Sequence, residues 1–160
     1  DCKWNAQCIG TPKATKQAEL PTAACRAKII ELLQWRQVVL LQGETGSGKT
    51  TQVPQYIFDA EWEVGRLPRI VVTQPRRLAA ITIASRVAEE RGERVGEGVV
   101  GYKVRGASAV NHKLCRILFC TTGVLLQRMK HLGRGRFFSH ETATHIIVDE
   151  VHERTAEVDF

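Results

Sequence analysis

The 160-residue sequence lacks long hydrophobic runs, has few aromatic residues (6%) and contains no C-x-x-C pair. Its apolar runs are about four residues long, whereas a membrane-spanning helix needs about 20, so we expect no membrane partner. The five cysteines are odd in number and irregularly spaced, which favours reduced thiols in the nucleus, cytoplasm or mitochondrial matrix. A zinc site built from Cys2, Cys8 and a distant histidine is the less favoured alternative.

The sequence has fewer acidic than basic residues, with 17 Asp and Glu and 23 Lys and Arg. The net charge is +6 and the sequence pI is about 9.3. A basic balance favours a polyanionic partner such as nucleic acid. Basic proteins with other roles share this balance, so the charge alone does not decide the partner.

The pattern G-x-x-x-x-G-K-[ST] occupies residues 43–50, between an apolar run at 38–41 and a predicted helix that starts near Lys49. Glycines let the backbone turn tightly, and successive N–H groups at a helix N-terminus then form a site for phosphate. Lys49 is predicted to reach the β- and γ-phosphates of a nucleotide, and the Thr50 hydroxyl to ligate Mg²⁺.

Strand-like and helix-like segments alternate along the rest of the chain, which predicts an α/β fold with a parallel sheet. Residues 1–19 are polar and patternless, and we interpret them as a linker or N-terminal extension. Pro54 is expected to kink its helix or to mark a short one. Residues 133–139 are expected to form a basic loop, and the basic stretch from Lys130 to Arg136 is interpreted as solvated surface without a functional motif. The predicted helices cover residues 21–34, 49–58, 78–91 and 124–132, and the strands or extended pieces cover 38–41, 70–73, 99–100, 102–105, 116–121 and 144–148.

A second group of polar residues directly follows the apolar run at 146–148. Ligands of open α/β sheets bind at the carboxyl ends of the strands, which is where Asp149 and Glu150 are predicted to lie. Asp149 is placed to hold Mg²⁺, and Glu150 to orient or deprotonate an attacking water. A cluster that merely closes a strand is the alternative, but the phosphate loop about 100 residues upstream favours a Mg-nucleotide site.

At this point the sequence resembles the DEAH/RHA group of superfamily 2 RNA helicases. Residues 43–55 (GETGSGKTTQVPQ) are similar to motif I, and residues 149–154 (DEVHER) to motif II, with Val151 in place of Ala. Residues 73–77 (TQPRR) resemble motif Ia, and residues 121–126 (TTGVLL) resemble motif Ib. The details lean towards the RNA helicase A/maleless branch.

The resemblance implies that residues 20–160 form the first RecA-like lobe of a P-loop NTPase, with an open, mainly parallel sheet and helices on both faces. We expect the sheet to continue past Phe160, and a second RecA-like lobe and C-terminal modules to belong to the same protein. Arginine fingers of a second lobe supply about 10³–10⁵ in rate in related NTPases. This stretch alone is therefore expected to bind nucleotide weakly and to hydrolyse it poorly.

The resemblance also assigns roles to single residues, with ATP and Mg²⁺ as cofactors. Arg86 matches the position that stacks on adenine, and His152 the position that couples the nucleotide site to the second lobe. The catalytic group is Lys49, Asp149, Glu150 and His152, the metal group is Thr50, Asp149 and Glu150, the RNA contacts are Arg76, Arg77, Arg105 and Thr122, and the nucleotide contacts are Gly43, Glu44, Thr45, Gly46, Ser47, Gly48, Lys49, Thr50, Thr51 and Arg86.

The function implied is an ATP-dependent RNA helicase that closes two lobes on single-stranded RNA or a ribonucleoprotein and uses hydrolysis to move the strand, with or without an activating protein. A helicase-like scaffold subunit that binds its partner without cycling is the first alternative. Another P-loop NTPase, such as a small kinase or a transporter ATPase, is the second, and neither is expected to carry motifs Ia and Ib together.

Overall fold

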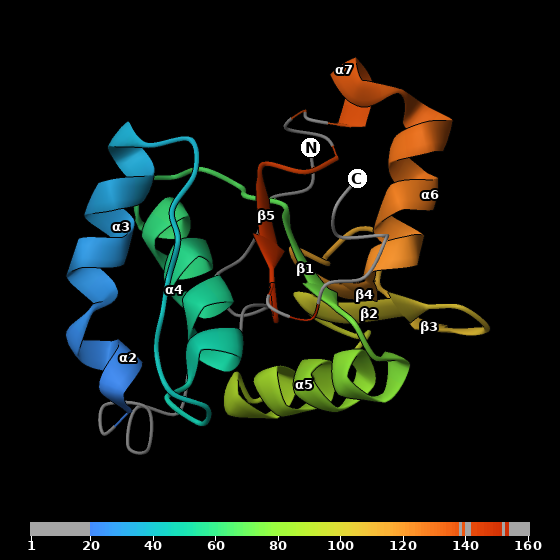
Figure 1. The fold of residues 1–160 in the computed structure, drawn as a ribbon. Helices are drawn as coiled ribbons and strands as arrows, with labels where there is room; N and C mark the ends of the chain where they lie inside the picture. The colour runs from blue at the N-terminus through green and yellow to red at the C-terminus, as the bar shows by residue number, and fades with distance from the viewer. Residues whose placement is uncertain (1–19, 138, 140–141, 152, 154–160) are drawn as a thin grey trace.

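The computed structural model describes residues 20–137, 139, 142–151 and 153. These residues fold into a five-stranded sheet with helices packed around it (Figure 1). The elements in chain order are α2 (Pro21–Ala24), α3 (Arg26–Trp35), α4 (Lys49–Glu63), β1 (Ile70–Gln74), α5 (Arg77–Glu90), β2 (Val100–Val104), β3 (Ala107–Ala109), β4 (Ile117–Thr121), α6 (Thr122–Leu132), α7 (Arg134–Phe137) and β5 (His145–Val148). No helix among these residues has the length and apolar character to cross a bilayer.

The sheet has the order β3-β2-β4-β1-β5 and is parallel except at one edge. β1 pairs in parallel with β4 and with β5, and β2 pairs in parallel with β4. The edge strand β3, which the sequence did not predict, runs antiparallel to β2. Arg105 and Gly106 form the two-residue turn between them, and Gly106 has a positive φ (83°), which glycine adopts more readily than other residues. The predicted α/β architecture with a mainly parallel sheet is confirmed.

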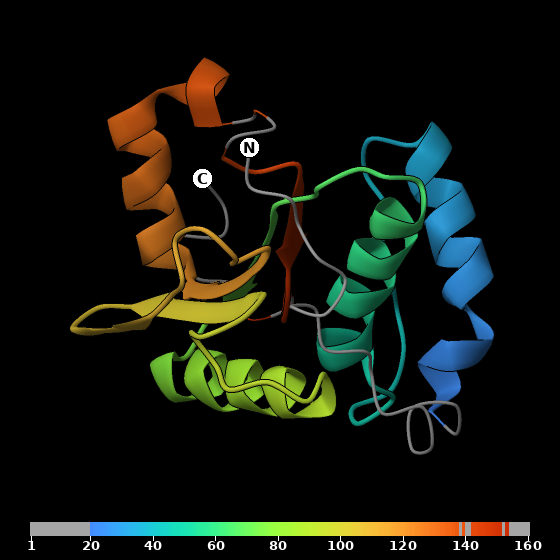
Figure 2. The ribbon, with the colours of Figure 1, turned by 180° about the vertical axis from the view of Figure 1, so that it is seen from behind.

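Alternating residues of the central strands face two separate cores. Val72 and Phe119, both fully buried, pack in a cluster with residues of α4 and α5. Val71, one position earlier, lies in a second cluster with Leu125 of α6 and Phe137 of α7. The helices therefore cover both faces of the sheet, as Figures 1 and 2 show from opposite sides.

Helix α4 runs for 15 residues and contains Pro54 in its interior. The expectation that this proline marks a short helix is wrong, because the helix continues to Glu63. Eight consecutive residues from Thr51 to Phe58 are buried, so packing outweighs the hydrogen bond that the proline cannot donate. The helix thus fixes the residues of the phosphate loop to the core.

The strand predicted over residues 38–41 is also wrong. Val39 and Leu41 are half-buried, but Val38 is 86% exposed and Leu40 is 84% exposed. This segment pairs with no strand among the described residues, and the sheet ends at β5 on one side. The apolar run 38–41 is half-buried at every second residue, but a strand also needs a neighbour for its backbone N–H and C=O groups.

The basic segment after residue 130 is more ordered than the sequence indicated. The loop predicted over residues 133–139 is partly wrong, because the short helix α7 forms there, although Lys130 and Arg136 are exposed as expected. Phe137 at the end of α7 is fully buried in the second core, next to Leu125 and Val71. The burial of one large apolar side chain, Phe137, therefore holds this basic segment against the core, although its charges alone are typical of a loop.

Candidate nucleotide site

The residues between 43 and 48 form a tight loop that leads directly into α4. Gly46 (φ 83°) and Gly48 (φ 91°) adopt the left-handed conformation that other residues rarely tolerate. A Cβ on Gly48 would lie only 2.9 Å from Leu20 Cδ1, so this position also needs a residue without a side chain. The loop therefore presents the N-terminus of a long helix, where unpaired N–H groups and the helix dipole favour phosphate.

Helix α2 supports this loop from outside the motif. The hydroxyl of Thr22, a residue that is 5% exposed, donates a hydrogen bond to the Ser47 carbonyl over 2.5 Å. The Thr22 backbone N–H donates to the same oxygen over 3.3 Å. Sequence reasoning assigned Thr22 only to a helix start, and nothing in the spacing from residue 22 to residue 47 indicated the contact.

Lys49 extends its side chain back across the loop. Its ammonium donates to the carbonyls of Gly43 and Glu44, both over 2.6 Å, and to Ser47 Oγ over 3.2 Å. Three oxygens of the loop thus hold one positive charge at the centre of the turn. A cation in this place can neutralise the phosphates of a bound nucleotide.

Thr50 and Asp149 meet although they belong to different motifs. The Thr50 hydroxyl donates to Asp149 Oδ2 over 2.5 Å. Gln74, at the end of β1, donates to the same oxygen through Nε2 over 2.7 Å. Gln74 is 2% exposed, so its amide is fixed by burial as well as by this bond. Sequence reasoning missed Gln74, although its place at the carboxyl end of a buried strand was a usable signal.

The chemistry of these groups fits a magnesium ion. Thr50 Oγ1 and the Asp149 carboxylate are hard oxygen donors, which Mg²⁺ prefers. The described residues contain no group of three or more His, Cys, Asp or Glu side chains that could hold a metal. Two protein oxygens match the way Mg²⁺ binds through one or two side chains, waters and substrate phosphates.

Glu150 has a backbone conformation that sets it apart from its neighbours. Its φ of 51° is the only positive value of a non-glycine residue in the described part of the chain. Its N–H donates to Asp149 Oδ1 over 3.0 Å, and the residue is exposed. Such conformations cost about 1–3 kcal/mol and concentrate at functional sites. His152, the remaining predicted catalytic residue, lies outside the described residues.

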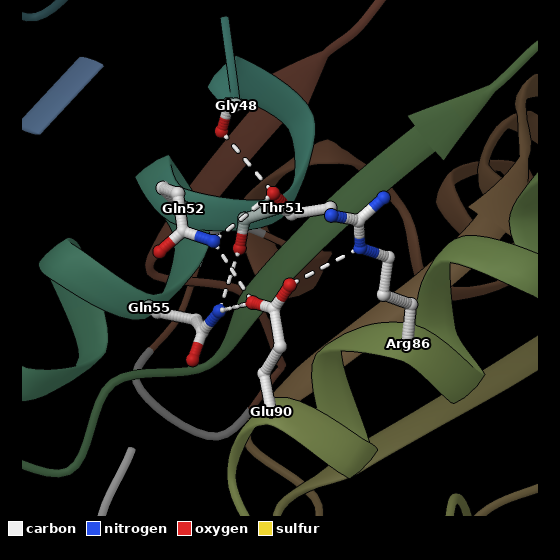
Figure 3. A network of polar contacts seen from close by, with 6 residues as sticks. All are labelled: Gly48, Thr51, Gln52, Gln55, Arg86 and Glu90. Atoms are coloured by element: carbon white, nitrogen blue, oxygen red, sulfur yellow. Dashed lines mark hydrogen bonds and ion pairs between the residues drawn. The ribbon is translucent and has the colours of Figure 1, made fainter. Parts of the chain in front are cut away.

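A polar network joins the phosphate-loop helix to Arg86 (Figure 3). Glu90 on α5 accepts hydrogen bonds from Gln52 Nε2 (2.8 Å) and Gln55 Nε2 (2.9 Å) through one carboxylate oxygen. Its other oxygen pairs with Arg86 Nε at 3.1 Å. Both glutamines are buried, whereas the Arg86 side chain is 65% exposed. The guanidinium is thus tethered at one end and available to solvent, next to the helix that follows the loop.

Thr51, another predicted nucleotide contact, lies within this network. Its hydroxyl donates to the Gly48 carbonyl over 3.3 Å and accepts from Gln52 Nε2 over 3.1 Å. The motif letters gave Gln52 and Gln55 no role, and Glu90 gave no signal in the sequence. The network becomes visible only when α4 and α5 are packed together.

The four predicted RNA contacts lie along one edge of the sheet. Arg105 follows β2, Thr122 follows β4, and Arg76 and Arg77 follow β1, so their order matches the order of the strands. Asp149 follows β5 at the same edge.

Two of these arginines have neighbours that the sequence did not predict. Arg76 Nη2 pairs with Glu153 Oε1 at 3.0 Å, which links the segment after β1 to the segment after β5. Arg77 Nη2 lies 3.6 Å from the point where a Cβ on Gly106 would stand. The guanidinium of Arg77 therefore approaches the turn that carries Arg105. This arrangement forms a basic row beside the nucleotide site.

Comparisons with known proteins agree with this geometry. Residues 23–160 match the family described as DEAD/DEAH box helicase. The chain is 50% identical over 143 residues to the putative ATP-dependent RNA helicase DHX57 of Mus musculus, covering 88% of this chain and 10% of the relative. It is 46% identical over 145 residues to the DExH-box ATP-dependent RNA helicase DExH2 of Arabidopsis thaliana, covering 90% and 9%.

A third relative is the probable ATP-dependent RNA helicase spindle-E of Drosophila yakuba, with 47% identity over 145 residues, 91% of this chain and 10% of the relative. The chain thus spans about a tenth of the length of these relatives. Their names do not select the RNA helicase A/maleless branch, so that assignment stays a prediction.

Proposed function

This chain belongs to the DEAD/DEAH box helicase family, and from that premise we propose that it is the ATP-binding first RecA-like lobe of a DEAH-type ATP-dependent RNA helicase. The proposal includes the domain boundaries, with residues 20–160 as the lobe and residues 1–19 as a linker or extension. The observation that carries it is the contact between Thr50 of the phosphate loop and Asp149 after β5. This contact supports the proposal because it joins the two motifs to which we assign the binding of Mg-ATP.

The loop residues bind the triphosphate of ATP in this proposal. Backbone N–H groups at the start of α4 face the phosphates, and the Lys49 ammonium exchanges its loop carbonyls for phosphate oxygens of higher negative charge. Thr50 and Asp149 would hold Mg²⁺, and this ion would neutralise charge at the transferring phosphoryl group. Gln74 keeps the Asp149 carboxylate oriented towards Thr50.

Glu150 acts on the attacking water. Its exposed carboxylate directly follows Asp149, where it can accept a hydrogen bond from the water and take up its proton. The left-handed backbone at Glu150 turns the chain away from the line of β5 at this point. His152 and the arginines of a second lobe complete the site in the intact protein.

The basic row at the same edge of the sheet binds the backbone of single-stranded RNA. Arginine and hydroxyl contacts to phosphate position a strand without reading its sequence. Arg76, Arg77, Arg105 and Thr122 stand at the ends of three adjacent strands, next to the nucleotide. Closure of a second lobe over both ligands can therefore couple the nucleotide state to the position of the RNA.

The test is ATP hydrolysis by the intact protein with and without single-stranded RNA. Hydrolysis should rise with RNA, and Glu150→Gln should lower it by about 10²–10⁴-fold while nucleotide still binds. Lys49→Ala should abolish nucleotide binding itself. The exposed Arg36 offers a matched control. Arg36→Ala should change neither the RNA-stimulated rate of hydrolysis nor the affinity for nucleotide. If ATP binds but no RNA elicits hydrolysis, the scaffold alternative replaces the motor.

A further inference from the structure

Helix α2 lies outside the phosphate loop in sequence but packs beside the start of α4 (Figure 1). Leu20, directly before α2, lies so close to Gly48 that a Cβ there would meet the leucine Cδ1 at 2.9 Å. Thr22 is 5% exposed, and its hydroxyl and its backbone N–H both donate to the Ser47 carbonyl, over 2.5 Å and 3.3 Å. One buried residue outside the motif therefore holds a single carbonyl of the loop with two hydrogen bonds.

The Ser47 carbonyl lies where helix α4 itself does not hold it. The Gly48 carbonyl accepts the Gln52 N–H over 2.8 Å and the Thr51 hydroxyl over 3.3 Å, so the hydrogen bonds of the helix begin at Gly48. The Ser47 carbonyl is one position earlier, before the left-handed backbone of Gly48 at φ 91°. Within the described part of the chain, the hydrogen bonds to the Ser47 carbonyl come from Thr22 alone.

The direction of this carbonyl determines the direction of the next N–H group. A trans peptide unit is planar, so the C=O of Ser47 and the N–H of Gly48 point in opposite directions. Because the carbonyl is directed towards α2, the Gly48 N–H is directed away from α2. Gly48 is the N-cap of α4, and the N–H groups at this end of a helix have no partner within it and can bind phosphate.

We propose that Thr22 is a positioning residue of the nucleotide site, which orients the Ser47–Gly48 peptide so that the Gly48 N–H can bind a phosphate oxygen of ATP. Thr22 acts through Ser47 and does not contact the nucleotide. Without the hydroxyl, the Ser47 carbonyl keeps only the longer bond from the Thr22 N–H. The peptide can then rotate more easily, because glycine allows more backbone conformations than other residues. This inference rests on the proposed function, since it requires the loop to bind a nucleotide phosphate.

The affinities of the intact protein for ATP and for inorganic pyrophosphate test this role. Thr22→Val replaces the hydroxyl by a methyl group, and both affinities should fall about three- to tenfold, the loss expected for one hydrogen bond. Thr22→Ser keeps the hydroxyl and should bind both ligands within about twofold of the unaltered protein. The affinity for single-stranded RNA without nucleotide should be unchanged in both variants, because the predicted RNA contacts follow β1, β2 and β4.

A matched control separates the orientation of the loop from the stability of the fold. The half-buried Thr144 also donates its hydroxyl to a backbone carbonyl, that of Arg69, over 3.2 Å. Thr144 precedes β5, at the opposite end of that strand from Asp149. Thr144→Val should lower the unfolding temperature as Thr22→Val does, but it should leave the affinities for ATP and pyrophosphate unchanged. Thr22→Ala removes the same hydroxyl with a residue that favours helix, and it takes the place of Thr22→Val if that variant does not fold.

Three results would overturn the inference. The first is equal affinity of Thr22→Val and the unaltered protein for both ligands, and the second is an equal loss in Thr22→Val and Thr144→Val. The third is a loss in Thr22→Ser as large as in Thr22→Val, because the hydroxyl would then not be the group that orients the peptide.

The proposed function can fail separately from this inference. A protein that binds ATP and pyrophosphate but shows no RNA-stimulated hydrolysis would contradict the motor and leave the result for Thr22 valid. An unaltered protein that binds neither ligand would overturn both conclusions.

Discussion

The Thr50 hydroxyl and the Asp149 carboxylate are joined by a 2.5 Å hydrogen bond across 99 positions of sequence. Thr50 lies in the first turn of α4, and Asp149 directly follows β5. The bond therefore joins the start of the helix that follows the loop to the carboxyl end of β5. It also brings two hard oxygen atoms to one point, and such atoms are the donors that Mg²⁺ prefers.

The first prediction concerns that pair of oxygens. Thr50→Val removes the hydroxyl and keeps the size and branching of the side chain, so RNA-stimulated ATP hydrolysis should fall about a hundredfold or more. Thr50→Ser keeps the oxygen and should retain most of the activity. A magnesium titration of both variants separates lost metal binding from lost folding. Equal activity of the two variants would show that the hydroxyl is not a ligand.

The second prediction concerns Gln74, which holds Asp149 from the side. Gln74→Ala should raise the Mg²⁺ concentration that gives half-maximal hydrolysis by about 10–100-fold. A loss of this size in metal affinity is typical when a residue that orients a metal ligand is removed. The exposed Gln127 gives a matched control, because Gln127→Ala removes the same amide away from the site. A Gln74→Ala enzyme with unchanged magnesium dependence would mean that Asp149 needs no such support.

The third prediction concerns Glu90, which binds the amides of Gln52 and Gln55. Glu90→Ala removes one of the two acceptors of each buried amide and leaves only the bonds to Thr51, so we expect a loss of about 1–3 kcal/mol in the free energy of unfolding. Glu89→Ala, on the exposed side of the same helix, should have little effect. Urea unfolding of the two variants measures the difference.

Glu90→Ala should also affect nucleotide binding, because Glu90 tethers Arg86. The affinity for ADP should fall more than the affinity for inorganic pyrophosphate, since Arg86 is proposed to contact the base. An equal loss for both ligands would separate Glu90 from recognition of the base.

The fourth prediction concerns His145 at the start of β5. Burial lowers the pKa of His145 below its ordinary 6.5, and the charges of Glu61 and Arg66 have smaller, opposite effects. The unfolded chain therefore binds a proton more readily than the folded chain, and stability should fall as the pH drops below about 6.5. His145→Asn should flatten this part of the stability curve, measured by urea unfolding between pH 7.5 and 5.5. An unchanged slope would assign the pH dependence to other groups.

The tight turn over residues 43–48 and the helix after it were predictable from the sequence because the glycines act locally. Gly46 and Gly48 need positive φ and Lys49 bends back over its own loop, so these contacts all lie within six residues. The same holds for most helices and strands, whose periodicity is a local property. The strand over residues 38–41 failed because pairing depends on a distant neighbour that no local pattern encodes.

The supporting residues of the site were not predictable in this way. Gln74 reaches Asp149 across 75 positions, and Gln52 reaches Glu90 across 38. A glutamine or glutamate in a helix or strand gives no signal that distinguishes a buried partner from a solvated surface. These positions can be identified only once the packing of α4, α5 and the sheet is known.

The most direct test of the helicase conclusion is strand displacement by the intact protein. The substrate is a duplex RNA with a single-stranded overhang, and displacement is measured with ATP, with a non-hydrolysable ATP analogue and with the Glu150→Gln variant. We predict displacement only when the unaltered protein is supplied with ATP. The unaltered protein with the analogue, and the Glu150→Gln variant with ATP, should still bind RNA without displacing a strand. RNA and ATP binding without displacement under any condition would contradict the motor and support a scaffold.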